Sequence, residues 1–136
     1  HHGNGTQEIF LGDPRVIYVS LHRYGAFYPG TGGSSEDNCL NYPFRYSARD
    51  DEYLKTLRLA LNRIEEFNPD LIAVSAGFDT HRADPVGALS LSEEAYFKIG
   101  RMISETGSNV FAVLEGGYGP YFPQCIRNFL HGLERR

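Results

Sequence analysis

Residues 71–78, LIAVSAGF, form the stretch that does most to determine the fold, because nearly every position is apolar or small. Two further runs have the same character: residues 16–22, VIYVSLH, and residues 110–114, VFAVL. A strand that is half exposed alternates apolar and polar residues, whereas a strand of a parallel sheet covered on both faces is apolar throughout. These runs therefore predict three buried strands of a parallel sheet. Residues 39–42, CLNY, are a weaker fourth candidate.

Helical periodicity fills the intervals between these strands. Apolar residues recur every three or four positions over 53–67 and over 92–106, and a third helix is predicted at 122–133. Strands that alternate with helices predict an α/β domain with a mostly parallel sheet and right-handed crossovers. The expected helix boundaries are Asp50 or Asp51 as the cap of the first helix, Ser92 as the cap of the second, and Gly107 as its end.

The composition is that of an ordinary globular protein. With 41% hydrophobic residues, 22% charged residues and a net charge of −4, the chain lacks the basic balance typical of nucleic-acid-binding domains. No apolar run approaches the roughly 20 residues that span a bilayer, so no membrane association is expected. Cys39 and Cys125 lie far apart, which predicts reduced thiols in a cytoplasmic protein. Because residue 1 is a histidine and not an initiating methionine, the natural chain is expected to begin further upstream.

Residues suited to chemistry follow the carboxyl ends of the predicted strands. His22 ends the first strand, Asp79 follows the second, and Gly116, Gly117 and Tyr118 follow the third. Because such ends meet at one edge of a parallel sheet, these residues are expected to lie close together. Each also has a plain structural interpretation: an aspartate as a turn former, glycines as a tight turn, a histidine as a hydrogen-bonded side chain. Spacing alone therefore indicates an enzyme-like α/β domain in which a metal site is one possibility.

Five motifs occur in one order along nearly the whole chain: HHGNGT at 1–6, VSLH at 19–22, FYPGTG at 27–32, SAGFDTHRADPVG at 75–87 and LEGGY at 114–118. Together they resemble the zinc-dependent histone deacetylase and acetylpolyamine amidohydrolase family, and HHGNGT and LEGGY are most similar to its class II and prokaryotic members. The resemblance implies the arginase-deacetylase fold, a three-layer α/β/α arrangement around a mostly parallel sheet. It also implies that residues 1–136 are the C-terminal part of a single deacetylase domain.

The resemblance implies a role for several residues in catalysis. His1 and Asp79 match two of the three protein ligands of the catalytic Zn²⁺, and the third, an aspartate, would lie upstream together with a tandem histidine pair. Such mixed nitrogen and oxygen ligands would also suit Fe²⁺ or Co²⁺. Tyr118 matches the catalytic hydroxyl that stabilises the oxyanion formed during hydrolysis.

The resemblance also implies a substrate tunnel and two structural K⁺ sites. The tunnel residues would be Tyr28, Val86 and Gly117. The first K⁺ would be held by His1, Ser20 and Leu21, and the second by Phe10, Asp13 and Val16. Asp13 departs from the residue type usual at the second K⁺ site.

These matches imply zinc-dependent hydrolysis of an acetyl amide, with an acetylated protein lysine or an acetylpolyamine as substrate and acetate as product. After Gly32 the chain lacks the long glycine-rich run of many members, so a more open tunnel rim is expected and the substrate is not assigned. Residues 1–136 alone are expected to be inactive because they supply at most two of three zinc ligands. Two alternatives stay open: a non-catalytic acetyl-lysine-binding protein, and a two-manganese ureohydrolase, which would require further aspartates near Asp79.

Overall fold

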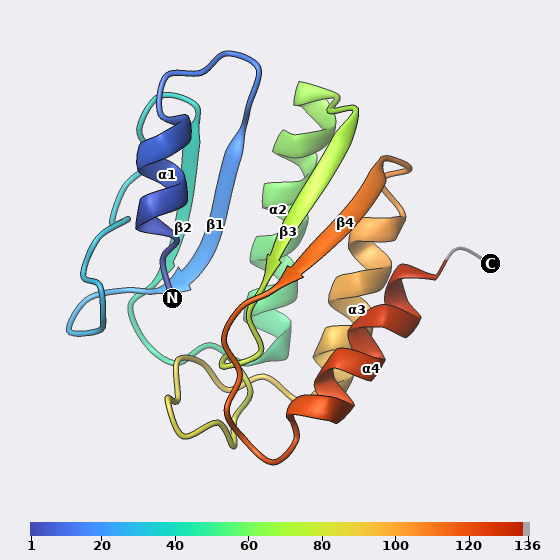
Figure 1. The fold of residues 1–136 in the computed structure, drawn as a ribbon. Helices are drawn as coiled ribbons and strands as arrows, with labels where there is room; N and C mark the ends of the chain where they lie inside the picture. The colour runs from blue at the N-terminus through green and yellow to red at the C-terminus, as the bar shows by residue number, and fades with distance from the viewer. Residues whose placement is uncertain (135–136) are drawn as a thin grey trace. The chain divides into compact units, whose positions relative to one another are not determined.

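The structure, a computed structural model, describes residues 1–134 and forms two compact units, His1–Ser47 and Ala48–Arg136. Each unit contains one pair of parallel strands, so the predicted α/β class with parallel strands is confirmed. The elements in chain order are α1 (Asn4–Phe10), β1 (Tyr18–Arg23) and β2 (Cys39–Phe44) in the first unit, and α2 (Asp50–Phe67), β3 (Leu71–Ala76), α3 (Glu93–Ser104), β4 (Asn109–Leu114) and α4 (Phe122–Leu133) in the second (Figure 1).

In the first unit, β1 and β2 pair in parallel from Tyr18 opposite Cys39 to Arg23 opposite Phe44, which confirms the weaker strand candidate at 39–42. Helix α1 is not predicted from the sequence. It has seven residues, no side-chain cap and no acidic residue in its first turn. Tertiary contacts stabilise it instead, because the Gln7 side chain accepts hydrogen bonds from His2 and Asn41 at 2.8 and 2.9 Å.

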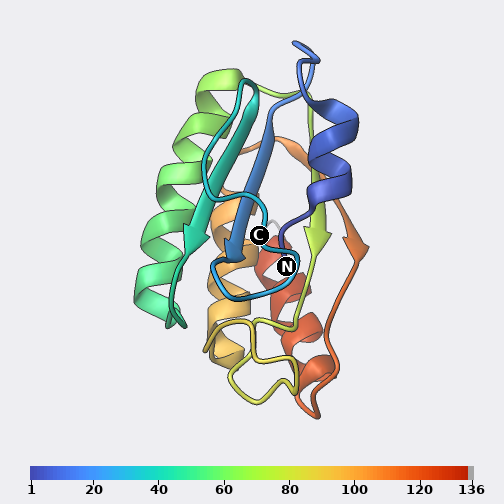
Figure 2. The ribbon, with the colours of Figure 1, turned by 90° about the vertical axis from the view of Figure 1, so that its left-hand side faces the viewer.

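In the second unit, β3 and β4 pair in parallel from Leu71 opposite Asn109 to Ala76 opposite Leu114. Helices α2, α3 and α4 lie on the same side of this pair (Figure 2). On the strands, Leu71, Phe111 and Val113 are 53%, 47% and 51% exposed. The prediction that both strands are buried on both faces is therefore wrong for this unit, because its helices cover one face only.

The boundaries of α2 and α3 test the predicted caps. The Ser92 hydroxyl accepts a hydrogen bond from the Ala95 N–H at 3.3 Å, as predicted. The predicted capping of α2 by Asp50 or Asp51 is wrong, because Arg49 occupies the N-cap position and makes no side-chain cap. The Asp50 carboxylate instead accepts hydrogen bonds from the N–H and the hydroxyl of Ser92, and so ties the start of α2 to the start of α3.

The core of the second unit lies where α3 crosses α4, next to the end of β3. At Gly100 and Gly132 a side chain would collide with the backbone of the opposite helix, so the two helices pack with their backbones in contact. The Phe78 ring, just beyond β3, packs against the rings of Tyr96 and Phe129, with centroids 5.4 and 5.9 Å away. This packing fixes the backbone at the position immediately before Asp79.

Candidate active site

Asp79 lies just beyond β3, beside the segment that follows β4. The two segments continue to pair beyond the strands. The Phe78 N–H donates to the Gly116 carbonyl at 2.8 Å, and the Glu115 N–H donates to the Ala76 carbonyl at 3.0 Å. The Asp79 side chain is 4% exposed. A Cβ atom on Gly116 would lie 2.5 Å from Asp79 Oδ2, so the carboxylate packs against a backbone position that only glycine can occupy. The predicted closeness of Asp79 and the glycine segment is therefore present in the structure.

Tyr118 follows this glycine segment and lies at the same edge of the β3–β4 pair. Gly117, assigned to the substrate tunnel from the sequence, has a φ of +138°, which residues with side chains rarely adopt, and a Cβ there would collide with the Phe122 ring. The Tyr118 side chain is 67% exposed. The backbone is thus tightly constrained while the phenol faces outward.

Asp84 joins the tyrosine turn to the loop that follows Asp79. Its Oδ2 accepts hydrogen bonds from the N–H groups of Tyr118 at 2.7 Å and Gly119 at 2.9 Å, and its Oδ1 accepts one from Val86 at 2.9 Å. One buried carboxylate, 7% exposed, therefore holds the backbone of both the tunnel candidate Val86 and the catalytic candidate Tyr118. This role of Asp84 does not follow from the sequence, in which its only signal is the position of Asp84 within the SAGFDTHRADPVG motif.

His81 is buried and connects the same loop to the start of α3. Its Nδ1 accepts a hydrogen bond from the Ala83 N–H at 3.1 Å, and its Nε2 lies 3.5 Å from a Glu93 oxygen without forming a hydrogen bond. Glu93 also pairs with Arg82 at 2.9 Å. The Glu93 backbone N–H, followed by His81 and Arg82, holds the pKa of the Glu93 carboxyl below its usual range. These contacts brace the loop that carries Asp84.

In the first unit, the predicted zinc ligand His1 lies against two aromatic rings. Its ring centroid is 5.1 Å from that of Phe27 and 5.7 Å from that of Tyr28. Tyr28, predicted to line the substrate tunnel, is 74% exposed. The sequence motifs place His1 and Tyr28 far apart in the chain, and this unit brings them together. Phe27 is an additional neighbour, marked in the sequence only by its place in FYPGTG.

Ser20 and Leu21, assigned to the first K⁺ site, lie in β1 next to a buried histidine pair. The His22 Nε2 donates to the Gly32 carbonyl at 3.0 Å, and its ring centroid is 4.5 Å from that of His2. Burial, with repulsion from His2, lowers the pKa of His22 to about 4, so the ring is neutral at neutral pH. Its Nδ1 then accepts from the Ser20 hydroxyl at 2.9 Å, which leaves the lone pairs of the Ser20 oxygen for other partners. Such an oxygen is suited to K⁺.

The three residues assigned to the second K⁺ site direct their carbonyl oxygens to one point. Asn38 Nδ2 donates to Phe10 at 2.8 Å, to Asp13 at 3.2 Å and to Val16 at 2.9 Å, while Asn38 Oδ1 accepts from the Gly12 N–H. An amide nitrogen carries two hydrogens, so at least two of these three carbonyl oxygens must share one hydrogen. The carbonyls therefore converge as a cation site would require, but a cation at this point would require the Asn38 side chain to move.

Asn38→Ala is expected to lower the free energy of unfolding of the whole protein by roughly 1–3 kcal/mol, because three converging carbonyls lose their shared donor. Thermal and denaturant unfolding measure this change. Asn62→Ala, at an exposed position in α2, is the control and should cause no comparable loss. Equal stability of Asn38→Ala and the wild type would contradict the proposed importance of this contact.

Among residues 1–134, no group of three or more His, Cys, Asp or Glu side chains forms a metal centre. His1 belongs to the first unit and Asp79 to the second. Their donor atoms fit zinc, since imidazole nitrogen and carboxylate oxygen are common zinc ligands. The burial of Asp79 agrees with such a role, because a buried carboxylate requires cations or hydrogen-bond donors around it.

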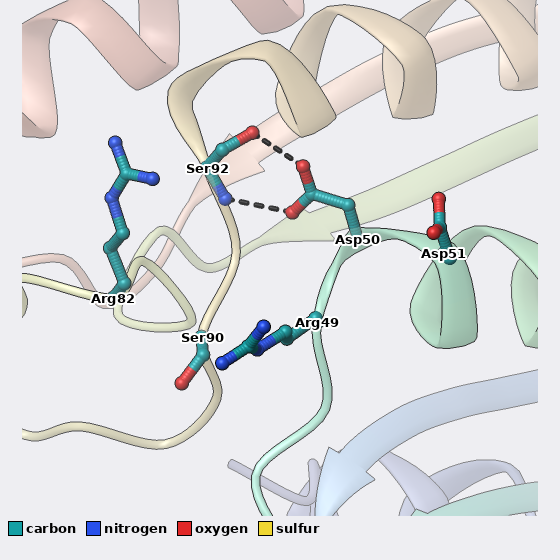
Figure 3. Close-up of a pocket in the computed structure, with 6 residues that line it drawn as sticks. All are labelled: Arg49, Asp50, Asp51, Arg82, Ser90 and Ser92. Carbon is teal, nitrogen blue, oxygen red and sulfur yellow. Dashed lines mark hydrogen bonds between the residues drawn. The ribbon is translucent and has the colours of Figure 1, made fainter.

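An open cavity of about 600 Å³ lies at the start of helices α2 and α3 (Figure 3). Two of its charged residues already have partners within the protein: Asp50 binds Ser92, and Arg82 binds Glu93. The cavity contains none of the predicted site residues and has two residues of each charge. Its lining residues are Arg49, Asp50, Asp51, Arg82, Ser90 and Ser92.

The two cysteines are free thiols buried in separate units. Burial raises the pKa of Cys125 to about 11, so this thiol stays protonated and weakly reactive at neutral pH. Within the described range 1–134, no helix combines the length and apolar character that crossing a membrane requires.

Comparison with known proteins identifies relatives of this chain. A family model described as the histone deacetylase domain matches residues 1–133. Type-2 histone deacetylase 2 of Dictyostelium discoideum is 39% identical over 98% of this chain and 9% of its own length. The structure of the histone deacetylase Clr3 matches with a TM-score of 0.89 and 36% identity, covering 98% of this chain and 25% of that one.

A second similar structure is that of a protein with a different name, an acetylpolyamine aminohydrolase. Acetylpolyamine aminohydrolase from Burkholderia pseudomallei matches with a TM-score of 0.88 and 28% identity, covering 97% of this chain and 42% of that one. The present chain therefore spans less than half the length of each of these relatives.

Proposed function

Because the chain belongs to the histone deacetylase domain family, we propose that the whole protein is a zinc-dependent deacetylase that hydrolyses an acetyl amide and releases acetate. The observation that carries this proposal is the arrangement of Asp79 and Tyr118 in the second unit. A buried carboxylate packs against Gly116, and an exposed phenol follows two residues later. In this proposal the Asp79 carboxylate would bind the metal and the Tyr118 hydroxyl would donate a hydrogen bond, both at one edge of the β3–β4 pair.

In the proposed reaction, His1 and Asp79 would each supply a zinc ligand in the whole protein, together with a further protein ligand. A zinc ion bound there would polarise the acetyl carbonyl and lower the pKa of a water molecule toward about 7. The K⁺ ions implied by the family would be structural and would not take part in the reaction. Ser20 and Leu21 would contribute to one such site, and the carbonyls around Asn38 to another.

Tyr118 would donate its hydroxyl hydrogen bond to the acetyl oxygen as that atom gains negative charge. Water adds to the carbonyl carbon, the carbon–nitrogen bond breaks, the amine leaves with a proton and acetate is released. A donor positioned for the charged state stabilises the transition state more than the substrate, which accelerates the reaction.

The proposed substrates share an acetyl amide at the end of a flexible methylene stem. Acetylated lysine in proteins and acetylpolyamines both have this form. Tyr28, 74% exposed, and Val86, 36% exposed, would provide apolar surface for the stem. Relatives named as histone deacetylases and as an acetylpolyamine aminohydrolase make both substrates worth testing.

Metal removal tests the proposal directly. The whole protein is expected to release acetate from an acetyl-lysine peptide or from an acetylpolyamine. Treatment with a zinc chelator should reduce this release to background, because the bound metal activates both water and carbonyl. Adding back Zn²⁺ should restore it, and Fe²⁺ and Co²⁺ should be tested alongside because the same ligands suit them.

The two substrates are assayed in parallel, with acetate measured by a coupled assay and metal measured by elemental analysis. Turnover that survives complete metal removal would contradict the proposal. Tight binding of the acetyl-lysine peptide without acetate release would instead indicate a non-catalytic binding protein.

A further inference from the structure

The carboxylate of Asp84 forms the densest set of backbone hydrogen bonds near the proposed catalytic tyrosine. One of its oxygens accepts from two consecutive N–H groups, those of Tyr118 and Gly119, at 2.7 and 2.9 Å. The other accepts from Val86 at 2.9 Å. We propose that Asp84 is a positioning residue, which acts on catalysis by fixing the backbone that aims the Tyr118 hydroxyl. This inference rests on the proposed function, in which that hydroxyl stabilises the oxyanion.

The reach of the Tyr118 hydroxyl depends first on the backbone position of Tyr118. Its side chain is 67% exposed, so packing constrains it less than it would a buried ring. Gly117 before it adopts a φ of +138°, where the chain relies on glycine for its conformation. The Asp84 carboxylate holds the backbone that follows Gly117 by accepting hydrogen bonds from the N–H groups of Tyr118 and Gly119.

The loop that carries Asp84 lies in close backbone contact with the turn at Gly119. A Cβ atom on Gly119 would lie 3.0 Å from the Ala83 carbonyl oxygen and 3.1 Å from the Asp84 Cα. Gly119 is therefore in direct backbone contact with the loop that carries Asp84. That loop is braced in turn by His81 and by the Arg82–Glu93 ion pair.

The backbone hydrogen bonds to Asp84 have a charged and largely buried acceptor. Hydrogen bonds from backbone N–H groups to a carboxylate are charge-assisted and stronger than those to a neutral acceptor. At 7% exposure, the Asp84 carboxylate is largely shielded from competing water. Since a displacement of about 1 Å can cost about a hundredfold in rate, a loosened turn should reduce turnover without removing any reacting group.

The experiment uses the whole protein and a matched control elsewhere in the same unit. Asp84→Asn keeps one carbonyl oxygen for the turn but loses the charge, and Asp84→Ala loses both acceptors. The control is Asp50→Asn, because Asp50 is also a carboxylate that accepts two hydrogen bonds, both from Ser92. It should leave kcat near the wild-type value. The kcat should fall roughly tenfold in Asp84→Asn and roughly a hundredfold in Asp84→Ala, with KM and bound zinc unchanged.

A double-variant cycle separates positioning from a general structural effect. If Asp84 acts through the Tyr118 hydroxyl, adding Asp84→Asn to Tyr118→Phe should lower kcat by less than about twofold further. Losses that multiply would overturn the inference while leaving the proposed function intact. Unfolding of Asp84→Asn under conditions where Asp50→Asn remains folded would also overturn it, because Asp84 would then be a stability residue.

Amide hydrogen exchange gives a readout that does not depend on activity. Exchange at residues 117–119 should be faster in the Asp84 variants than in the wild type or in Asp50→Asn. Unchanged exchange there would overturn the inference. If Tyr118→Phe does not alter turnover, the catalytic role proposed for Tyr118 fails, and this exchange comparison alone decides whether Asp84 holds the turn.

Discussion

In the whole protein, Asp79→Asn is expected to eliminate bound zinc and to reduce acetate release to background. The substitution replaces a carboxylate with a neutral amide of the same shape, and zinc sites in proteins use carboxylate oxygens, not amide oxygens. Since the side chain is 4% exposed and packs against Gly116, no solvent-accessible neighbour can easily take its place. The expected loss is therefore of the metal itself and not only of rate.

Elemental analysis of the purified variant measures the metal, and thermal unfolding shows whether the fold is kept. Asp70→Asn is the matched control, because Asp70 is an exposed aspartate immediately before the same strand. It should retain both zinc and turnover. Zinc at the wild-type level in Asp79→Asn would contradict the assignment of Asp79 as a ligand.

Much of the fold follows from local patterns along the chain. The apolar runs at 71–78 and 110–114 become β3 and β4, and Ser92 caps α3 as its position before Glu93 and Glu94 predicts. Both features depend on residues close together in sequence, where the periodicity of a strand or the side chain of a cap determines structure directly.

The features that the sequence analysis missed depend on contacts between distant residues. Helix α1 lacks local helix signals, and Asn41, 34 residues from Gln7, supports it. Asp50 is positioned to cap α2 but binds Ser92, 42 residues away, because the starts of two helices lie together. No window of sequence contains such information.

The candidate site also has some features that follow from local sequence patterns and others that depend on contacts between distant residues. The rule that strand ends meet at one edge predicts that Asp79 and the segment leading to Tyr118 lie together, and the structure has this arrangement. The hydrogen bond from Tyr118 to Asp84 joins residues 34 positions apart, and the one from Asn38 to Phe10 joins residues 28 positions apart. Neither follows from a local sequence pattern. Residue type indicates what an aspartate or an asparagine is able to bind, but only the fold determines its partner.

Tyr118→Phe in the whole protein is expected to lower kcat by about 10²–10³ and to leave KM, zinc content and stability near their wild-type values. The change removes one hydroxyl group from a side chain that is 67% exposed, so little packing is lost. The lost hydrogen bond would form mainly as the acetyl oxygen becomes charged, which is why the effect falls on kcat and not on KM.

The matched control for this prediction is Tyr121→Phe, which removes a hydroxyl three residues further along the same loop. Tyr121 is 47% exposed and its ring packs against that of His81, a contact that phenylalanine preserves. Steady-state kinetics should show normal turnover for Tyr121→Phe and the large kcat loss for Tyr118→Phe alone. An equal loss in both variants would indicate that the loop as a whole is sensitive to substitution. A Tyr118→Phe variant with wild-type kcat would mean that the oxyanion is stabilised by another group.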